Sequence, residues 1–471
     1  MDGPSVAERG RPDARRREGE YSAYSTDEQR SDGPARRATP EAMRNRLFGK
    51  EHLTRLVCAK VDISGALAPA RTNMAPHARL FFVDFLRALA AQGIVLHHLA
   101  FYGPLSDHAR TLAPTTIDWL YEHARMAVQI FFVTAGYFAA RSLSRRAPGG
   151  LRAAGRLMVD RYRRIGLPYW AALAVCLVAN ELARGFADLP SISASPTLPQ
   201  IVAHALLLHD VLGYPALTAG IWFLAVDMQL YFLTTLLCAL AARLWTRRGP
   251  WVAQGVLAGL GLVSAFWWNR IQGLDRYALY FLGSYALGLV VAWAEQRRLP
   301  RAFLWAYLAA LVGAQFVEFR PRLGVATLTA LLLAVAGQRG WLTSWPKSKL
   351  IQRLGETSYS LFLVHFPVSL LITAYWSSRL PPDPWLSLAG MAVCYLASLA
   401  VAFPFHALET RLVNLGSARP APATARTRAG TGHDPRMTIG MGLNRPASLA
   451  GRGEVELSLN PRMESRRSAG A

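Results

Sequence analysis

Cysteine is scarce in this sequence of 471 residues, which contains only four. Cys58, Cys176, Cys238 and Cys394 are far apart, form no Cys-x-x-Cys pair, and in three cases lie in apolar segments. This spacing argues against a disulfide framework and against a zinc site. No metal centre is therefore predicted.

Charged residues are also few, at 17% of the chain, whereas hydrophobic residues make up 52%. The hydrophobic residues fall in blocks of about 17 to 22, the length that crosses a bilayer. The net charge of +22 comes almost entirely from Arg in the two terminal regions and in short loops. Basic loops beside apolar spans set membrane topology, so this charge requires no nucleic-acid partner.

The N-terminal region lacks the order of basic, apolar and small residues that marks a cleavable signal peptide. Insertion is therefore expected to rely on internal spans. Residues 1–76 and 413–471 are polar and rich in Arg, a composition that predicts two disordered basic tails. Met74 directly precedes the first apolar span, which suggests the hypothesis that translation starts there.

Between the tails, residues 77–412 are predicted to form an all-α, polytopic membrane helix bundle of about ten transmembrane helices. A further apolar stretch, residues 201–212, is too short to span. We detect no repeat between the two halves, a feature common in transporters. The expected spans are residues 80–101, 126–143, 165–183, 220–243, 251–268, 277–294, 302–318, 323–337, 358–376 and 385–405.

The orientation follows from the basic residues of the short loops. With a cytoplasmic N-terminus, the inner loops hold about 17 Lys and Arg and the outer loops about 8. Positive charge is retained on the cytoplasmic side. The prediction is a multi-pass protein of a bacterial-type inner (plasma) membrane with both termini in the cytoplasm.

The first span contains ionisable residues that are costly at membrane depth. Arg87 and His98 are eleven positions apart, which places them on one helix face about 16 Å apart along the axis. Each charged group costs roughly 2.5 to 3.5 kcal/mol to insert, so the pair indicates function. Asp84, three residues before Arg87, is placed to neutralise it. The alternative is that Arg87 reaches the inner interface and His98 meets water at the outer one.

Five ordered segments in residues 78–412 resemble the membrane-bound acyltransferase 3 family of sugar and glycan O-acyltransferases. Three departures from the family pattern are Asp227, where the family has Glu, Ala135, where it has Ser, and Glu409, which is followed by Thr-Arg rather than Pro. The matching segments are the Arg87 and His98 pair, Phe131-Phe-Val-Thr-Ala-Gly-Tyr137, Arg161-Tyr-Arg-Arg-Ile-Gly-Leu-Pro-Tyr169, Trp222-Phe-Leu-Ala-Val-Asp-Met-Gln-Leu-Tyr231 and Gly355-Glu-Thr-Ser-Tyr-Ser-Leu-Phe-Leu-Val-His-Phe-Pro367.

The resemblance implies an enzyme that moves an acyl group, most commonly acetyl, from acyl-CoA to a hydroxyl of a sugar, often in a cell-surface glycan. The expected partners are acyl-CoA, a sugar, glycan or lipid-linked carbohydrate acceptor, and the bilayer, with no bound cofactor. His98 is expected to be the general base. The predicted catalytic residues are His98, Arg87 and Asp227, and the predicted substrate-binding residues are Arg161, Arg164, Trp222, Gln229, Tyr359 and His365.

Counting residues from the span ends assigns a depth to these groups. Arg87 and His365 fall in the cytoplasmic third, above a basic loop at 161–164 that is suited to CoA phosphates. His98 and Asp227 fall in the outer third, where a carboxylate could orient the imidazole. The alternatives are that the basic loop only sets topology, that Asp227 pairs with another basic residue, and that His365 is structural.

Two further classes of function remain open at this point. A transporter or flippase would use Arg87, Asp227 and His365 to line a path for an anionic or glycan substrate. A membrane scaffold would act through its basic tails. Trp222 and Tyr231 could equally be interfacial aromatic residues, and His97, which points about 100° away from His98, is expected to pack.

Overall fold

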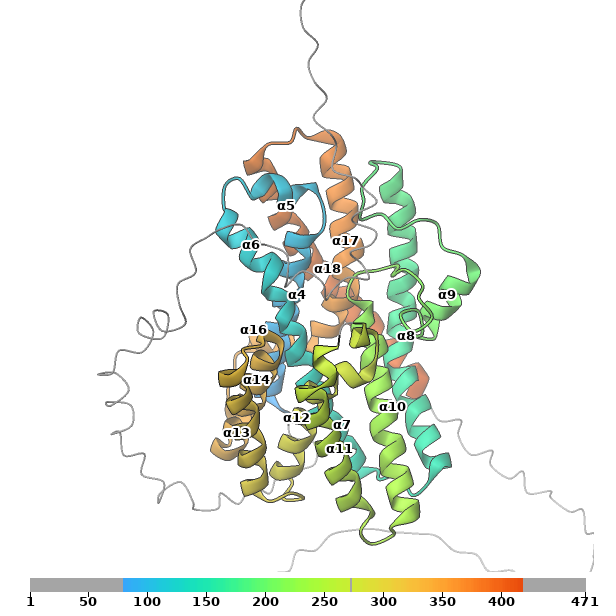
Figure 1. Cartoon of the computed structure of the whole chain (residues 1–471). Helices are drawn as coiled ribbons and strands as arrows, with labels where there is room; N and C mark the ends of the chain where they lie inside the picture. Colours follow the sequence, from blue (N-terminus) through green and yellow to red (C-terminus); the bar gives the residue numbers. More distant parts are fainter. Residues whose placement is uncertain (1–78, 272, 418–471) are drawn as a thin grey trace, which may run out of the picture. The chain divides into compact units, whose positions relative to one another are not determined.

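The computed structural model describes residues 79–271 and 273–417, and within these ranges every regular element is a helix (Figure 1). The prediction of an all-α helix bundle is confirmed. The predicted tails, with Met74, lie outside the described residues except for residues 413–417. Those five residues continue the last helix, so the helical domain extends past the predicted boundary at residue 412.

The long helices follow the predicted apolar spans, and the short helices lie in the connections between them. The long elements are α4 (Phe81–Phe101), α7 (Val128–Arg145), α8 (Leu151–Arg184), α10 (Ile221–Leu244), α11 (Gly249–Phe266), α12 (Ala278–Glu295), α13 (Arg301–Val317), α14 (Pro321–Arg339), α17 (Ser358–Arg379) and α18 (Pro384–Ser417). The short ones are α5 (Pro104–Ala109), α6 (Pro114–Glu122), η2 (Ala124–Ala127), α9 (Leu198–Ala205), η3 (Trp268–Arg270), η4 (Leu274–Arg276), α15 (Trp341–Ser344) and α16 (Lys349–Glu356).

Eight helices of the described residues are long and apolar enough to cross a membrane. The other two predicted spans correspond to α13, an apolar helix of 17 residues, and α4, whose 21 residues include Asp84, Arg87, His97 and His98. At 1.5 Å per residue, α4 is about 31 Å long, which matches the hydrocarbon thickness. The protein is a multi-pass membrane protein.

The predicted basic loop at residues 161–164 is wrong, because these residues lie inside α8, which continues unbroken for 34 residues. No Gly-Pro or Pro-Gly turn signal separates Leu151 from the apolar part of this helix. Pro168 lies within the helix and, lacking an N–H, leaves the carbonyl of Arg164 without its usual helical donor. The arginines therefore extend from a rigid helix rather than from a flexible loop.

Helices α7 and α12 approach each other closely through two glycines. A Cβ built on Gly288 would lie 1.9 Å from the carbonyl oxygen of Val133, and one built on Gly136 would lie 2.0 Å from that of Tyr285. Small residues at a membrane helix interface allow this backbone proximity. The close pairing fixes the position of α12, which carries Phe281 and Tyr285 toward the interior.

We predict that Gly288→Ala lowers the free energy of unfolding by about 3 kcal/mol, because the added methyl group would overlap the backbone of α7. The measurement is thermal unfolding of the purified protein in detergent. Gly259→Ala in α11 is the matched control, because a Cβ there would meet no atom within 4 Å. Equal melting temperatures for the two variants would contradict this account of the interface.

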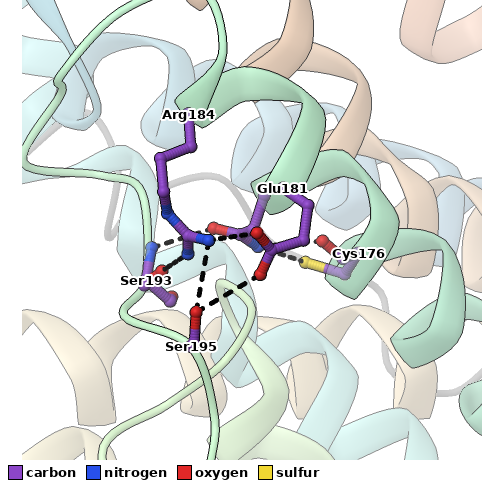
Figure 2. A network of polar contacts seen from close by, with 6 residues as sticks. Cys176, Glu181, Arg184, Ser193 and Ser195 are labelled. Atoms are coloured by element: carbon purple, nitrogen blue, oxygen red, sulfur yellow. Dashed lines mark hydrogen bonds and ion pairs between the residues drawn. The ribbon is translucent and has the colours of Figure 1, made fainter.

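The segment between α8 and α10 is fixed by side-chain hydrogen bonds at both of its ends. At the end of α8, Arg184 donates to Glu181, to the Ser193 carbonyl at 2.7 Å and to the Ser195 hydroxyl at 3.3 Å (Figure 2). Further along, the thiol of Cys176 donates to the carbonyl of Leu217 at 3.3 Å. The segment therefore has defined contacts with the helix that precedes it.

His204 holds the second half of this segment. Its Nε2 accepts a hydrogen bond from the backbone N–H of Leu217 at 3.1 Å, and its Nδ1 donates to the carbonyl of Gln200 at 2.9 Å. Burial lowers the pKa of His204, partly offset by the bond to Gln200. The neutral ring, which can both donate and accept, is the form that makes these two bonds.

Candidate active site

Two histidines from distant parts of the sequence meet in the interior. His98, near the end of α4, and His365, in α17, are 6% and 1% exposed. The Nδ1 of His98 lies 2.7 Å from the Nε2 of His365, and the two rings are nearly parallel, with centroids 5.0 Å apart. His98 and His365 therefore form a hydrogen-bonded pair.

The surroundings of His365 determine which atoms of the pair carry protons. The Nδ1 of His365 lies 3.1 Å from the carbonyl of Leu361, which only accepts, so this nitrogen carries a proton. With both rings neutral, the Nε2 of His365 is then an acceptor, and the Nδ1 of His98 must donate to it. This arrangement leaves a lone pair on the Nε2 of His98, the atom that a general base uses.

The predicted depth of His365 is wrong, since it lies beside His98 rather than in a different third of the bundle. A Cβ built on Gly355 would lie 2.5 Å from the carbonyl oxygen of Asp84, which fixes the register of the two segments. His98 lies fourteen residues beyond Asp84 in α4, whereas His365 lies in α17, which starts just after the end of α16. The ends of the apolar segments in the sequence did not reveal how far α4 and α17 are displaced relative to each other along their axes.

The suggested pairing of Asp227 with His98 is also wrong. Asp227, only 4% exposed, accepts from the Nη2 of Arg161 at 2.6 Å, and the guanidinium of Arg161 lies 4.7 Å from the ring centre of Tyr231. The alternative, a basic partner other than His98, is the observed one. Asp227 and Arg161 form an ion pair between α10 and α8 in which the carboxylate is buried and the arginine is partly exposed.

Further polar groups surround this ion pair. Arg87 interacts electrostatically with Asp84, Glu409 and Arg164. Asp84 itself is hydrogen-bonded to Arg79, with the Nε of Arg79 2.8 Å from its Oδ2. Arg79, rather than Arg87, is therefore the hydrogen-bonded partner of Asp84.

Tyr359, in α17, also belongs to this group of polar residues. Its hydroxyl donates to the carbonyl of Ile165 at 2.8 Å, and the phenol interacts electrostatically with Glu409, Asp227 and Arg161. Tyr359 thus connects α17 to α8 at the residue that follows Arg164.

Several buried polar atoms near Arg161 have no hydrogen-bond partner among the described residues. They are Arg161 Nε, Asp227 Oδ1, Tyr169 OH and Tyr285 OH. Buried polar atoms without partners are rare in proteins, and each one calls for an explanation such as a ligand or an ordered water. The four atoms supply both donors and acceptors, so this region is suited to a polar ligand.

A cavity of about 240 Å³ adjoins His98 on the other side of the histidine pair. Tyr102 and Gly220 line it; the ring of Tyr102 lies 5.4 Å from the His98 ring, and a Cβ on Gly220 would lie 3.4 Å from the Cε1 of His98. Trp222, Phe281 and Arg322 also line the cavity. All these residues lie at or near helix ends that are predicted to face the outside of the membrane.

Trp222 thus lines the cavity, whereas Gln229 is not among its lining residues. The amide oxygen of Gln229 accepts from the backbone N–H of Ala278 at 2.9 Å, and its nitrogen donates to the carbonyl of Arg276. These bonds join α10 to the start of α12. The structure thus gives Gln229 a contact between helices, and its substrate-binding role stays a prediction.

Burial perturbs two neighbouring groups on the loop that borders the cavity. It lowers the pKa of His209 to about 3, with a smaller contribution from His204. It raises the pKa of Asp210 to about 6, an effect that Arg276 partly opposes and Asp275 adds to. His209 is thus neutral near pH 7 and adds no positive charge to the cavity wall.

We predict that Gly220→Ala lowers kcat/KM for the acyl transfer that the family resemblance implies by about tenfold or more, because the new methyl group would crowd Phe362 and the His98 ring. The backbone adds a cost, since φ at Gly220 is +75°. The control is Gly273→Ala, which has φ of +85° but no atom within 4 Å of the added Cβ. Equal rates for both variants would show that the contact with His98 is irrelevant.

Comparison with known proteins now identifies the family. The family model described as "Acyltransferase domain" matches residues 80–407. The chain therefore belongs to the acyltransferase 3 family, as the ordered segments predicted.

Two curated proteins are similar to the chain. The peptidoglycan O-acetyltransferase OatA of Listeria monocytogenes is 23% identical over 353 residues, which cover 67% of this chain and 53% of that protein. The acyltransferase MdmB of Streptomyces mycarofaciens is 26% identical over 397 residues, covering 76% of this chain and 98% of that protein. The chain thus spans about half the length of the first relative and nearly all of the second. No solved structure matches.

Sequence reasoning missed the contact of His365 with His98 and the place of Glu409 beside Arg87. His365 was recognised as a residue of interest, but no spacing rule connects positions 267 residues apart. Glu409 had a detectable signal, since it is an acidic residue close to the apolar span at 385–405. Tyr285 offered no such signal, because a tyrosine in an apolar helix is usual.

Proposed function

We propose that the protein is a membrane O-acyltransferase that moves an acyl group from acyl-CoA to a hydroxyl of a sugar or glycan. The observation that carries this proposal is the His98–His365 pair, which leaves the Nε2 of His98 as a proton acceptor beside a cavity. Family membership and the two similar acyltransferases support the reaction class.

In the proposed reaction, the Nε2 of His98 takes the proton of the acceptor hydroxyl as its oxygen attacks the thioester carbonyl. The carbon–sulfur bond then breaks, the acyl group stays on the acceptor oxygen, and the CoA thiolate takes up the proton that His98 had received, which restores the neutral imidazole. His365 acts as a positioning residue, because its bond holds the imidazole of His98 in one tautomer and one orientation. No covalent acyl-enzyme is required.

The donor is proposed to bind on the side of Arg87, Arg161 and Arg164. Guanidinium groups suit the CoA phosphates because they stay charged and donate in pairs. The unpartnered atoms of Tyr169, Tyr285 and Asp227 supply polar contacts for the acyl-bearing arm. Arg87 lies about 16 Å along α4 from His98, so its role is to hold the donor and not to touch the acceptor hydroxyl.

The opposite cavity is proposed to receive the acceptor from outside, with both termini in the cytoplasm. This direction follows from the excess of Lys and Arg in the inner loops. The histidine pair would then act at the junction between a cytoplasmic donor and an external acceptor.

The test is acyl-CoA turnover by the full chain in reconstituted vesicles supplied with acetyl-CoA and peptidoglycan-derived glycan fragments. The expected result is release of free CoA together with a mass increase of one acetyl group on the glycan. Transport of either molecule without CoA release would overturn the proposal and favour a carrier. Mass spectrometry of surface glycans and metabolites, with and without the gene, would identify the natural acceptor.

A further inference from the structure

Gln129 is a buried polar residue in the wall of the cavity beside His98. It is the second residue of α7, it is only 2% exposed, and it lines the cavity together with Trp222 and Phe281. A glutamine side chain carries one oxygen that accepts hydrogen bonds and one nitrogen that donates two. The partners of these two atoms decide what Gln129 offers to a ligand.

The oxygen of this side-chain amide is already engaged. The hydroxyl of Ser284, in α12, donates to the Oε1 of Gln129 at 2.7 Å, and Ser284 is itself buried, at 7% exposure. This bond fixes which way the amide is turned. The Nε2 of Gln129 makes no hydrogen bond within the described residues, and the cavity is the space that it borders. Two N–H donors of a buried side chain are therefore left for a molecule in the cavity.

Aromatic rings lie next to this amide. Phe281 precedes Ser284 by three residues on α12 and so lies on the same helix face. The ring centre of Phe281 is 5.3 Å from that of Trp222 and 4.6 Å from that of Phe132, which follows Gln129 by three residues on α7. The wall thus combines an oriented donor with an apolar aromatic surface, as is typical of small-molecule sites.

A carbonyl oxygen is the group that best satisfies the two N–H donors. It accepts two hydrogen bonds and brings no proton of its own. A hydroxyl would bring a proton that needs an acceptor, and the amide oxygen of Gln129 already accepts from Ser284. A methyl group next to the carbonyl would pack on the rings of Trp222 and Phe281. An acetamido group has both this carbonyl and this methyl group.

We propose that Gln129 is a specificity-determining residue of the acceptor subsite and that it selects a sugar carrying an N-acetyl group. Its Nε2 donates to the acetamido carbonyl, the methyl group contacts the aromatic rings, and a hydroxyl of the same sugar reaches His98. The inference rests on the proposed function, because it deepens the identity of the acceptor. A sugar with a hydroxyl in place of the acetamido group satisfies the amide less well and binds more weakly.

The test measures binding and not turnover, so its outcome is independent of acyl transfer. The full chain, purified in detergent, is titrated with methyl 2-acetamido-2-deoxy-β-D-glucoside or with methyl β-D-glucoside, and ligand-detected NMR gives both dissociation constants. We expect the N-acetyl sugar to bind at least about tenfold more tightly, the effect of a hydrogen bond to an otherwise unsatisfied buried donor.

Variants then locate the preference. In Gln129→Met, which keeps a side chain of similar length without N–H donors, the ratio of the two affinities should fall by about tenfold or more. The matched control is Gln254→Met, which replaces a buried glutamine of α11 that is not among the residues lining the cavity and should preserve the ratio. Ser284→Ala, which frees the amide to turn over, should lower the ratio while leaving Gln129 in place.

Two results would overturn the inference: equal affinity of the wild-type protein for both sugars, which needs no variant to fold, or a preference that survives in Gln129→Met. Neither result bears on acyl transfer itself. The proposed function fails separately, if the wild-type protein releases no CoA in reconstituted vesicles.

Discussion

Replacing His98 with alanine should lower acyl transfer by about 10²- to 10⁴-fold, the range that a positioned general base contributes. The reason is that the Nε2 of His98 is the atom of the pair left with a lone pair, while its Nδ1 is committed to His365. The measurement is the rate of CoA release by the variant in reconstituted vesicles, normalised to the amount of inserted protein.

The neighbouring histidine provides a matched control. His97 is equally buried, at 2% exposure, but its Nδ1 lies 3.2 Å from the carbonyl of Leu120 and its ring faces another part of the bundle. His97→Ala should therefore change the rate far less than His98→Ala. A His98→Ala protein that retains more than a tenth of the wild-type rate would remove His98 from the mechanism.

The ion pair of Arg161 and Asp227 should give the largest effects on stability. Arg161→Met leaves the carboxylate of Asp227 buried without its partner and should destabilise the protein by about 3 to 5 kcal/mol. Asp227→Leu leaves the partly exposed Arg161, which water can solvate, and should cost less. The double variant Arg161→Met/Asp227→Leu should recover most of this loss, since apolar residues of similar volume replace the whole pair. Denaturant titration of the detergent-solubilised protein measures all three variants.

The same variants separate structure from donor binding. If Arg161 also binds the donor, the double variant should be stable and yet have an acyl-CoA affinity at least about tenfold lower, because charge-assisted bonds to phosphate are lost. Wild-type acyl-CoA affinity in a stable double variant would restrict Arg161 to a structural role.

The fold was largely predictable because bilayer spans are continuous and apolar. Each expected span is matched by a helix, and the short stretch at 201–212 overlaps the end of the eight-residue helix α9 and forms no spanning helix. The prediction that was wrong about the fold concerned the point where a helix begins. The arginines at 161–164 look like a loop to any hydropathy argument, yet helical hydrogen bonds continue through polar residues where no breaker intervenes.

The sequence by itself determined the family, the membrane-spanning helices and the presence of Arg87 and His98 on one face of the first helix. These properties depend on local order: the length of apolar runs, the helical period and the succession of motifs. Only the tertiary structure decided which groups meet. His98 contacts His365 and Asp227 contacts Arg161, because the close packing of Gly355 against Asp84, and the continuation of α8 through residues 161–164, set the relative heights of the helices. Sequence spacing carries no information about that stagger.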